Sequence, residues 1–346
     1  MRYTLPPSAD FLSLPFDTVI DVRSPSEFAE DHMPGAINLP VLSDKERAMV
    51  GTIYVQDSPF KARKIGAALV ARNAARHLEN SLINKDGGWK PLVYCWRGGQ
   101  RSGSFTTILR QVGWRAEVVE GGYKAYRALV KHALYDTPFA PKVVLLDGNT
   151  GSAKTDILAA LKARGVQVID LEGLANHRGS LFGARAGGQP SQKAFESALA
   201  QVVAGLDPSR PVVVEAESSK VGQLVVPPQL WAAMRAAPRL EIVAPLAARA
   251  RFLAVAYKDI VEDKARLLKT LGKLRTYHAA GTIEHWCKLA ENSEMEALAA
   301  ALMAEHYDPR YGKARADKAE VTTLPVSGLA TEDINAVAAQ IAARLA

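Results

Sequence analysis

Cysteine 95 lies in the part of the sequence best suited to nucleophilic chemistry. Residues 93–102 (VYCWRGGQRS) follow an apolar strand signal and precede a helical pattern. Such a loop is expected to turn backbone N–H groups towards the sulfur, where the helix dipole, Arg97 and Arg101 also favour negative charge. These effects stabilise the thiolate, which is the nucleophilic form of cysteine. We therefore predict that Cys95 is catalytic and that Arg97 and Arg101 assist it.

The competing interpretation of this segment is a structural cysteine buried at the end of a strand. Two arginines and two glycines within six residues are poor material for a core, so the pattern favours the reactive cysteine. Cys287 has no comparable loop and is predicted to pack within a helix. A single loop cysteine without suitably spaced ligand partners also argues against a zinc site.

A second motif, at residues 145–155 (LLDGNTGSAKT), has the spacing of a phosphate-binding loop, with Ala153 where a glycine is usual. It follows a strand signal and opens a helix, where backbone N–H groups attract anions. Lys154 would add a cationic contact and Thr155 could ligate Mg²⁺, although a chance Gly/Lys pattern is the alternative. The residues predicted to bind phosphate or diphosphate are Gly148, Asn149, Thr150, Gly151, Ser152, Ala153, Lys154 and Thr155.

The acidic residues expected to accompany a phosphate loop are less clearly marked. Residues 211–217 (PVVVEAE) form an apolar strand signal that ends in glutamate, where aspartate is usual. Glu215 or Glu217 could hold magnesium through water, or could instead orient a neighbouring arginine. Nucleotide hydrolysis is therefore not established by the sequence, and the loop could equally hold the diphosphate of another ligand.

Short apolar strands that alternate with helical patterns must position both motifs, which predicts α/β domains with parallel sheets. Strand signals occur at 18–22, 91–94 and 116–119, then at 142–147, 166–171, 211–215 and 240–243. The proline-bearing segment 132–141 separates the two groups. We predict domains at 1–134 and 135–346, with a helical segment at about 245–310 and a last helix at 332–345.

The whole-chain composition narrows the class of protein. The 346 residues allow about two domains, and 48% hydrophobic with 23% charged residues is typical of globular proteins. No apolar run approaches a membrane span, and the first residues do not resemble a signal peptide. Two cysteines exclude a disulfide scaffold and favour the cytoplasm. The net charge of +7 favours an anionic partner or phosphate-bearing ligands.

Much of this positive charge gathers at the start of the helical segment. Residues 245–275 hold eight basic and three acidic residues, which would attract nucleic-acid phosphates but could also be a solvated helix face. Tyr257 and Tyr277 could stack on bases or belong to the core. The residues predicted to contact nucleic acid are Arg249, Arg251, Lys264, Arg266, Lys269, Lys273 and Arg275.

The first domain resembles a rhodanese domain. The resemblance rests on the cysteine loop and on residues 21–23 (DVR), 27–28 (EF), 32–38 (HMPGAIN) and 120–123 (EGGY). It implies a parallel sheet and a cysteine that carries a transferable chalcogen as a persulfide. Phosphatases with related loops are the competing interpretation, and residues 32–38 are expected to be mainly structural.

The combination of both motifs resembles the bacterial tRNA 2-selenouridine synthase family over nearly the whole chain. Further matching stretches are 94–99 (YCWRGG), 148–151 (GNTG), 177–183 (HRGSLFG), 192–196 (QKAFE), 215–218 (EAES) and 307–309 (YDP). The two glycine-bearing polar loops near 177 and 192 are expected to flank the phosphate site, with ordinary solvent loops as the alternative. Their predicted substrate contacts are His177, Arg178, Ser180, Gln192 and Lys193.

Membership of this family implies that selenium replaces sulfur in 2-thiouridine at the tRNA wobble position. Selenophosphate would be the selenium donor, and a geranyl group from geranyl diphosphate would first alkylate the sulfur. The phosphate loop would then hold geranyl diphosphate, while Cys95 receives or delivers selenium. The expected partners are this tRNA and a selenophosphate-producing enzyme, with no membrane; no tightly bound cofactor is expected, and Mg²⁺ is possible.

Two other functions fit parts of the sequence. An ATP-dependent sulfurtransferase or small-molecule kinase fused to a rhodanese domain would hydrolyse nucleotide in a reaction that depends on Lys154. A phosphate-sensing or RNA-binding module with an inert cysteine loop would leave tRNA modification unchanged when Cys95 is replaced.

Overall fold

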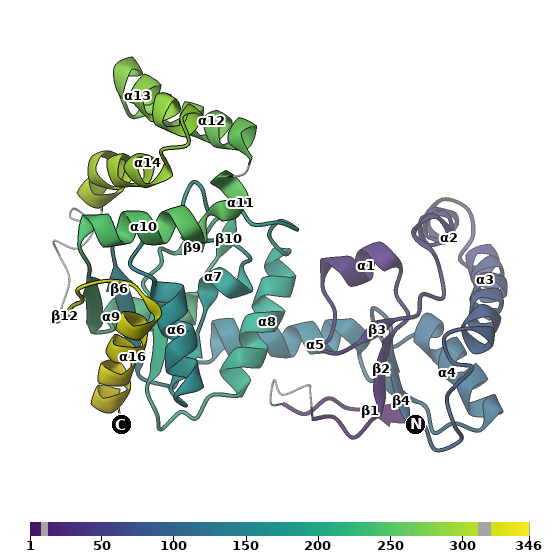
Figure 1. The fold of residues 1–346 in the computed structure, drawn as a ribbon. Coiled ribbons are helices and arrows are strands. Elements are labelled where there is room, and N and C mark those ends of the chain that lie inside the picture. Colours follow the sequence, from purple (N-terminus) through teal and green to yellow (C-terminus); the bar gives the residue numbers. More distant parts are fainter. Residues whose placement is uncertain (8–12, 262, 311–319, 346) are drawn as a thin grey trace. The chain divides into compact units, whose positions relative to one another are not determined.

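The computed structural model describes residues 1–7, 13–261, 263–310 and 320–345, apart from the side chain of Asp259. The chain forms two compact units (Figure 1). The first comprises Met1–Pro138 and Pro190–Gly205, and the second Phe139–Gln189 and Leu206–Ala346. Within the described residues, no helix combines the length and apolar character that crossing a membrane requires.

The first unit is built on a parallel sheet whose strand order is β1-β5-β4-β2-β3. Strand β4 is buried along its whole length and therefore places the residue that follows it, Cys95, at the carboxyl edge of a closed core. Phe105 and Leu109 of the next helix pack into the same core. The strands are β1 (Arg2–Tyr3), β2 (Thr18–Asp21), β3 (Ile37–Asn38), β4 (Pro91–Tyr94) and β5 (Glu117–Val119).

Helices surround this sheet, and several begin at side-chain caps that the sequence supplies. Ser43 accepts a hydrogen bond from the backbone of Glu46, and Ser58 one from the backbone of Lys61. The helices are α1 (Pro25–Glu30), α2 (Asp44–Gln56), α3 (Pro59–Glu79), α4 (Gln100–Val112), α5 (Gly122–Lys131), the π-helical turn η1 (His132–Asp136) and α8 (Gln192–Ala204).

The second unit holds another parallel sheet, with strand order β12-β11-β6-β8-β7 and a separate antiparallel pair, β9 and β10. Strand β6 lies at the centre and runs directly into the phosphate loop, whose helix α6 follows. Its elements are β6 (Val143–Gly148), α6 (Lys154–Ala163), β7 (Gln167–Ile169), α7 (Leu171–Leu174), β8 (Val212–Glu215), β9 (Lys220–Val221), β10 (Leu224–Val225), α9 (Pro228–Ala236), β11 (Arg239–Val243), β12 (Val321–Pro325) and α16 (Thr331–Leu345).

A helical part is inserted between β11 and β12, as predicted for residues 245–310 (Figure 1). It has its own core around the fully buried Trp286, against which Cys287 also packs, as predicted. The elements are α10 (Leu246–Ala256), α11 (Lys258–Val261), α12 (Lys264–Gly272), the 3₁₀ turn η2 (Lys273–Thr276), α13 (Ala280–Glu291), α14 (Met295–Leu302) and the π-helical turn η3 (Met303–Tyr307).

The predicted α/β fold with two parallel sheets is confirmed, but the division of the chain differs in detail. The first unit continues to Pro138 and also includes residues 190–205, which were predicted to belong to the second domain. The reason is the set of polar groups that α8 carries. Ser197 donates a hydrogen bond of 2.9 Å to the buried carboxylate of Asp31, and Glu196 forms an ion pair with Arg127.

Candidate active site

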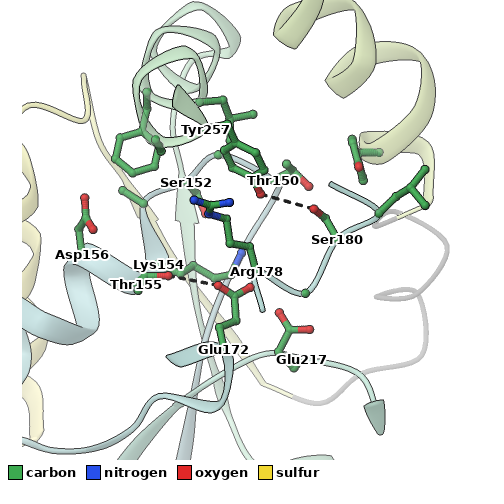
Figure 2. A pocket seen from close by; sticks show the side chains of 18 of the residues that line it. Thr150, Ser152, Lys154, Thr155, Asp156, Glu172, Arg178, Ser180, Glu217 and Tyr257 are labelled. Carbon is green, nitrogen blue, oxygen red and sulfur yellow. Dashed lines mark hydrogen bonds between the residues drawn. The ribbon is translucent and has the colours of Figure 1, made fainter. Parts of the chain in front are cut away.

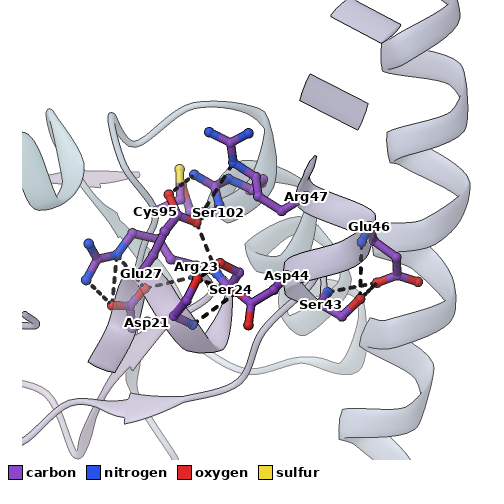
Figure 3. Close-up of polar contacts among 12 residues, drawn as sticks. Asp21, Arg23, Ser24, Glu27, Ser43, Asp44, Glu46, Arg47, Cys95 and Ser102 are labelled. Atoms are coloured by element: carbon purple, nitrogen blue, oxygen red, sulfur yellow. Dashed lines mark hydrogen bonds and ion pairs between the residues drawn. The ribbon is translucent and has the colours of Figure 1, made fainter. Parts of the chain in front are cut away.

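The cysteine loop connects β4 to α4 and holds the Cys95 thiol in a buried position, with 4% of the residue exposed. The hydroxyl of Ser102, in the first turn of α4, donates to Sγ over 3.2 Å. This contact holds the sulfur at the start of α4. Figure 3 shows Cys95 and Ser102 together with the charged side chains around them.

Close backbone contacts fix the shape of this loop. The carbonyl of Cys95 accepts a 2.8 Å hydrogen bond from the backbone of Tyr123, and that of Trp96 accepts one of 3.0 Å from Lys124. Gly122 has a φ of +60°, and a side chain there would overlap the Cys95 carbonyl. Only glycine therefore allows the start of α5 to pack directly against the cysteine loop.

The charges beside the cysteine are arranged around Glu27 (Figure 3). Arg101 donates to its carboxylate over 2.7 and 3.3 Å, and Nε of Arg47 lies 4.0 Å from the same carboxylate. Burial alone would raise the pKa of Glu27, but the hydrogen bond and charge of Arg101 outweigh it and lower that pKa. Arg101 is thus held by an ion pair, whereas Arg97 is exposed. Arg47 was not found from the sequence, because it lies on α2, far along the chain from the cysteine loop.

In the second unit, the predicted phosphate loop connects β6 to α6 through glycines with positive φ. Gly148 and Gly151 have φ values of +154° and +82°, and Nζ of Lys154 donates to the Gly148 carbonyl over 3.0 Å. Ala153 adopts the left-handed conformation, with a φ of 55°. A non-glycine residue is strained there by about 1–3 kcal/mol, which accounts for the usual glycine at this position.

The loop opens into a cavity of about 880 Å³ that lies wholly within the second unit (Figure 2). Its walls come from the phosphate loop, α7, residues 178–181, the end of β8, α10 and the segment after η3. The charged residues that line it are Lys154, Asp156, Glu172, Arg178, Arg185, Glu217 and Arg310.

The predicted residues are distributed unequally around this cavity. Residues 150–155, Arg178, Ser180 and Glu217 line it, while Gly148 and Asn149 lie behind the lining. Glu215 is 2% exposed and accepts the backbone N–H of Glu172, so it supports the wall from inside the core.

Three further predicted contacts lie outside the lining of the cavity. His177 positions the adjacent loop, because its Nδ1 accepts the N–H of Gly179 over 3.1 Å. Gln192 and Lys193 lie on α8 of the first unit, where they contact Glu196 and Glu30 respectively.

Two carboxyl groups meet at the floor of the cavity (Figure 2). Thr155 donates a 3.3 Å hydrogen bond to Glu172, and the carboxyl groups of Glu172 and Glu217 both lie next to Gly179. Burial and then the charge of Glu172 raise the pKa of Glu217 to about 8. Glycine at 179 leaves room for this pair, because a side chain there would meet both carboxyl groups within 3 Å.

An apolar slot of about 80 Å³ adjoins the large cavity. The two share Thr150, Ser180, Leu253, Tyr257 and Tyr307, so the slot meets the cavity at Thr150 of the phosphate loop. Its remaining walls are almost entirely aliphatic or aromatic: Phe182, Ala254, Ile260, Val261, Leu267, Met295, Leu298, Ala299, Leu302 and Met303.

The structure separates the predicted nucleic-acid contacts into two groups. Arg249 is 7% exposed and binds both carboxylate oxygens of Asp308, over 3.0 and 2.7 Å, so it supports the fold. Lys264 and Arg266 donate to the carbonyls of Glu291 and Ala184. Lys264 is nonetheless exposed, as are the remaining four residues: Arg251, Lys269, Lys273 and Arg275.

The two candidate aromatic residues also differ. Tyr257 lies in the wall of the cavity, where the Arg178 guanidinium stacks 4.7 Å from its ring centre. Tyr277 is 66% exposed and is not part of the core.

Several residues of the cavity were not found from the sequence. Glu172, Arg185 and Arg310 come from segments without a recognisable motif, and chain folding alone brings them to the phosphate loop. Of these three residues, Glu172 could most readily have been predicted, because it closely follows the end of β7, at the same edge of the sheet as the phosphate loop.

The fold and the two sites define a rhodanese-like domain joined to a P-loop domain. Family models match both parts: "Rhodanese-like domain" at residues 9–129 and "tRNA 2-selenouridine synthase AAA domain" at residues 141–269. The chain belongs to the tRNA 2-selenouridine synthase family.

Curated relatives described as tRNA 2-selenouridine synthase match over different lengths. The one from Sulfurovum sp. is 34% identical, over 89% of this chain and 92% of its own length. That from Psychromonas ingrahamii is 35% identical, over 72% and 67%. That from Pseudomonas syringae pv. syringae is 39% identical, over 67% of this chain and 63% of the relative.

Proposed function

We propose that this enzyme replaces sulfur by selenium in the wobble 2-thiouridine of tRNA, through an S-geranyl intermediate made from geranyl diphosphate. The observation that carries the proposal is the joining of an anion-binding loop to an apolar slot through shared wall residues. A ligand with a diphosphate at one end and a hydrocarbon chain at the other matches the polar and apolar character of this pair, and the slot of about 80 Å³ would take part of the chain. The apolar slot would not serve a nucleoside triphosphate, whose base and ribose are polar.

The first step is alkylation of the thiouridine sulfur. The C1–O bond of geranyl diphosphate breaks, a C–S bond forms, the N3 proton of the thiouracil leaves and diphosphate is released. Lys154 and the backbone N–H groups of the phosphate loop would stabilise the charge that develops on the departing diphosphate. The slot around Leu253 and Met303 would hold the hydrocarbon chain and exclude water from the allylic carbon.

The second step exchanges the alkylated sulfur for selenium, supplied by selenophosphate. An S-alkyl group is a better leaving group than a thiocarbonyl sulfur, so geranylation prepares C2 for attack. We assign the delivery of selenium to Cys95, whose sulfur accepts a hydrogen bond from Ser102. The selenium of selenophosphate would attack C2, the C2–S bond would break with geranylthiol as the leaving group, and water would then cleave the Se–P bond and release phosphate. Cys95 would guide the anionic selenium donor to the base without a change of oxidation state.

Magnesium would fit the phosphate side of this site. Thr155 and Glu172, whose side-chain oxygens lie 3.3 Å apart at the cavity wall, would hold the ion. Oxygen donors of this kind are the ligands that Mg²⁺ prefers, although the described residues contain no cluster of three metal-binding side chains. Bound Mg²⁺ would neutralise part of the diphosphate charge.

The test is nucleoside mass spectrometry of tRNA from cells that lack this chain and are complemented with variants. Cys95→Ala should abolish selenouridine and let S-geranyl-2-thiouridine accumulate, whereas Cys287→Ala should behave like the wild type. Lys154→Ala should lower the geranylated product first, with Lys162→Ala on the same helix as its control. Loss of both products in Cys95→Ala would refute the division of labour, and an unchanged geranyl level in Lys154→Ala would refute the diphosphate site.

The same variants and tRNA samples also test the competing function. An ATP-dependent sulfurtransferase or kinase would hydrolyse nucleotide in a reaction that Lys154→Ala abolishes, and would leave tRNA selenium unchanged. The apolar slot favours the prenyl diphosphate over this alternative.

A further inference from the structure

An exposed tyrosine contacts a residue that lines the large cavity, which is here called the diphosphate cavity after its proposed ligand. Tyr277 follows η2, and 66% of its surface is exposed, although its neighbour His278 packs against the buried Trp286. The Arg310 guanidinium lies over the Tyr277 ring, 5.1 Å from its centre, and Arg310 also lines the cavity. The tyrosine is therefore connected to the cavity wall through one planar cation.

This arginine is held firmly in place. Nη1 of Arg310 donates to Nδ1 of His306 over 2.7 Å and to the His306 carbonyl over 2.6 Å. Nε2 of His278 lies 2.8 Å from the same Nδ1. Burial, and then the charges of Arg310 and His278, lower the pKa of His306 to about 4, so the imidazole is a neutral acceptor at physiological pH. The orientation of Arg310 is thus fixed before any ligand binds.

The sequence just before Tyr277 carries the charge that an RNA backbone requires. Lys269, Lys273 and Arg275 are exposed and lie within eight residues of the tyrosine. Cations of this kind attract phosphates without regard to sequence, whereas an unstacked base is held by stacking on an aromatic ring or a guanidinium plane. A single exposed aromatic ring among several exposed cations provides both kinds of contact.

We propose that Tyr277 and Arg310 form the stacking site for the wobble 2-thiouridine, which is turned out of the anticodon and presented to the diphosphate cavity. Arg310 backs one face of the Tyr277 ring, and the base stacks on the other. Lys269, Lys273 and Arg275 hold the flanking phosphates. This inference rests on the proposed function, because a thiouridine must bring its sulfur to the diphosphate end of the prenyl substrate.

Photocrosslinking locates the base directly. An anticodon stem-loop with 5-iodouridine at the wobble position is irradiated with the full-length protein, and the crosslinked peptides are sequenced by mass spectrometry. The expected crosslink is at Tyr277, and it should disappear in Tyr277→Ala. Crosslinks that form only elsewhere in the chain would overturn the proposal.

Kinetics then separate stacking from folding and from prenyl binding. With a 2-thiouridine stem-loop, Tyr277→Ala should raise the KM for RNA in geranylation by about 5- to 100-fold, since one stacked base contributes that much to binding. Tyr277→Phe should retain wild-type KM, and the affinity for geranyl diphosphate should be unchanged in both variants. Tyr54→Ala serves as the matched control, because that tyrosine is also exposed, at 55%, but lies on α2.

The outcomes also distinguish this inference from the function on which it rests. A wild-type protein that binds geranyl diphosphate and alkylates the stem-loop, with an equal KM in Tyr277→Ala and Tyr54→Ala, would refute the stacking site alone. A wild-type protein that neither binds geranyl diphosphate nor alkylates thiouridine would refute the proposed function.

Discussion

The neighbouring carboxyl groups of Glu172 and Glu217, beside the phosphate loop, predict that anion binding depends on pH. Burial and the charge of Glu172 raise the pKa of Glu217 to about 8, so Glu217 is largely protonated at pH 7. Deprotonation at higher pH adds a negative charge beside Glu172, in the cavity that accepts a diphosphate under the proposed function. The affinity for the diphosphate should therefore fall as the pH rises through 8.

The size of this effect follows from the protonated fraction. For a group with a pKa of about 8, that fraction falls about tenfold between pH 7 and pH 9. If only the protonated form binds, the affinity falls by the same factor of about ten, or about 1.4 kcal/mol, and this is the upper limit of the change. Replacement of Glu217 by glutamine keeps the uncharged form at every pH and should remove the dependence.

The assay is calorimetric titration of the full chain with geranyl diphosphate at pH 7, 8 and 9, without divalent cations. The charge of the ligand changes little over this range, because the second ionisation of a phosphate group lies near pH 6. Glu217→Gln should bind equally at all three values, and Glu296→Gln, an exposed residue of α14, should follow the wild type. A flat wild-type profile, or an equally steep one in Glu217→Gln, would refute the reasoning.

Three further predictions concern residues that support the structure of the two sites. Ser102→Ala removes the hydroxyl that donates to the thiol and should slow alkylation of Cys95 by iodoacetamide about fivefold at pH 7; an unchanged rate would contradict this role. Gly122→Ala should lower the free energy of unfolding by about 2–4 kcal/mol in urea, because its Cβ overlaps the cysteine loop, while Gly103→Ala on α4, with open space around it, should not destabilise. Arg239 forms a buried ion pair with Asp147, with 2.6 Å between Nη1 and Oδ2. Arg239→Met leaves this carboxylate without its ion-pair partner and should lower the free energy of unfolding by about 3–5 kcal/mol in the same assay. A loss below 1 kcal/mol would show that water compensates the charge.

Local patterns predicted the parts of both sites that are continuous in the chain. The cysteine loop and the phosphate loop each follow an apolar strand and open a helix, and both features can be recognised within about ten residues. The central strands were found for the same reason. Strands β1 and β3, with two residues each, are too short to show any alternation.

The sequence did not predict contacts between residues that lie far apart in the chain. Arg249 belongs to a strongly basic segment, yet it is buried against Asp308, 59 residues further on. Gln192 and Lys193 follow the phosphate loop along the chain but pack with the first unit, because the acceptor for Ser197 is the carboxylate of Asp31. Amphipathic spacing shows that a helix is buried, but not which surface covers it.

Because α8 belongs to the first unit, the two units cannot be produced as separate continuous fragments of the chain. The polypeptide passes between the units three times, after Pro138, after Gln189 and after Gly205. A single cut near residue 138 would leave α8 on the C-terminal fragment, so that α8 and the rest of the first unit would be held together only by non-covalent contacts such as that of Ser197 with Asp31. A gene fragment that stops there would lack a helix and expose the carboxylate of Asp31 that α8 covers.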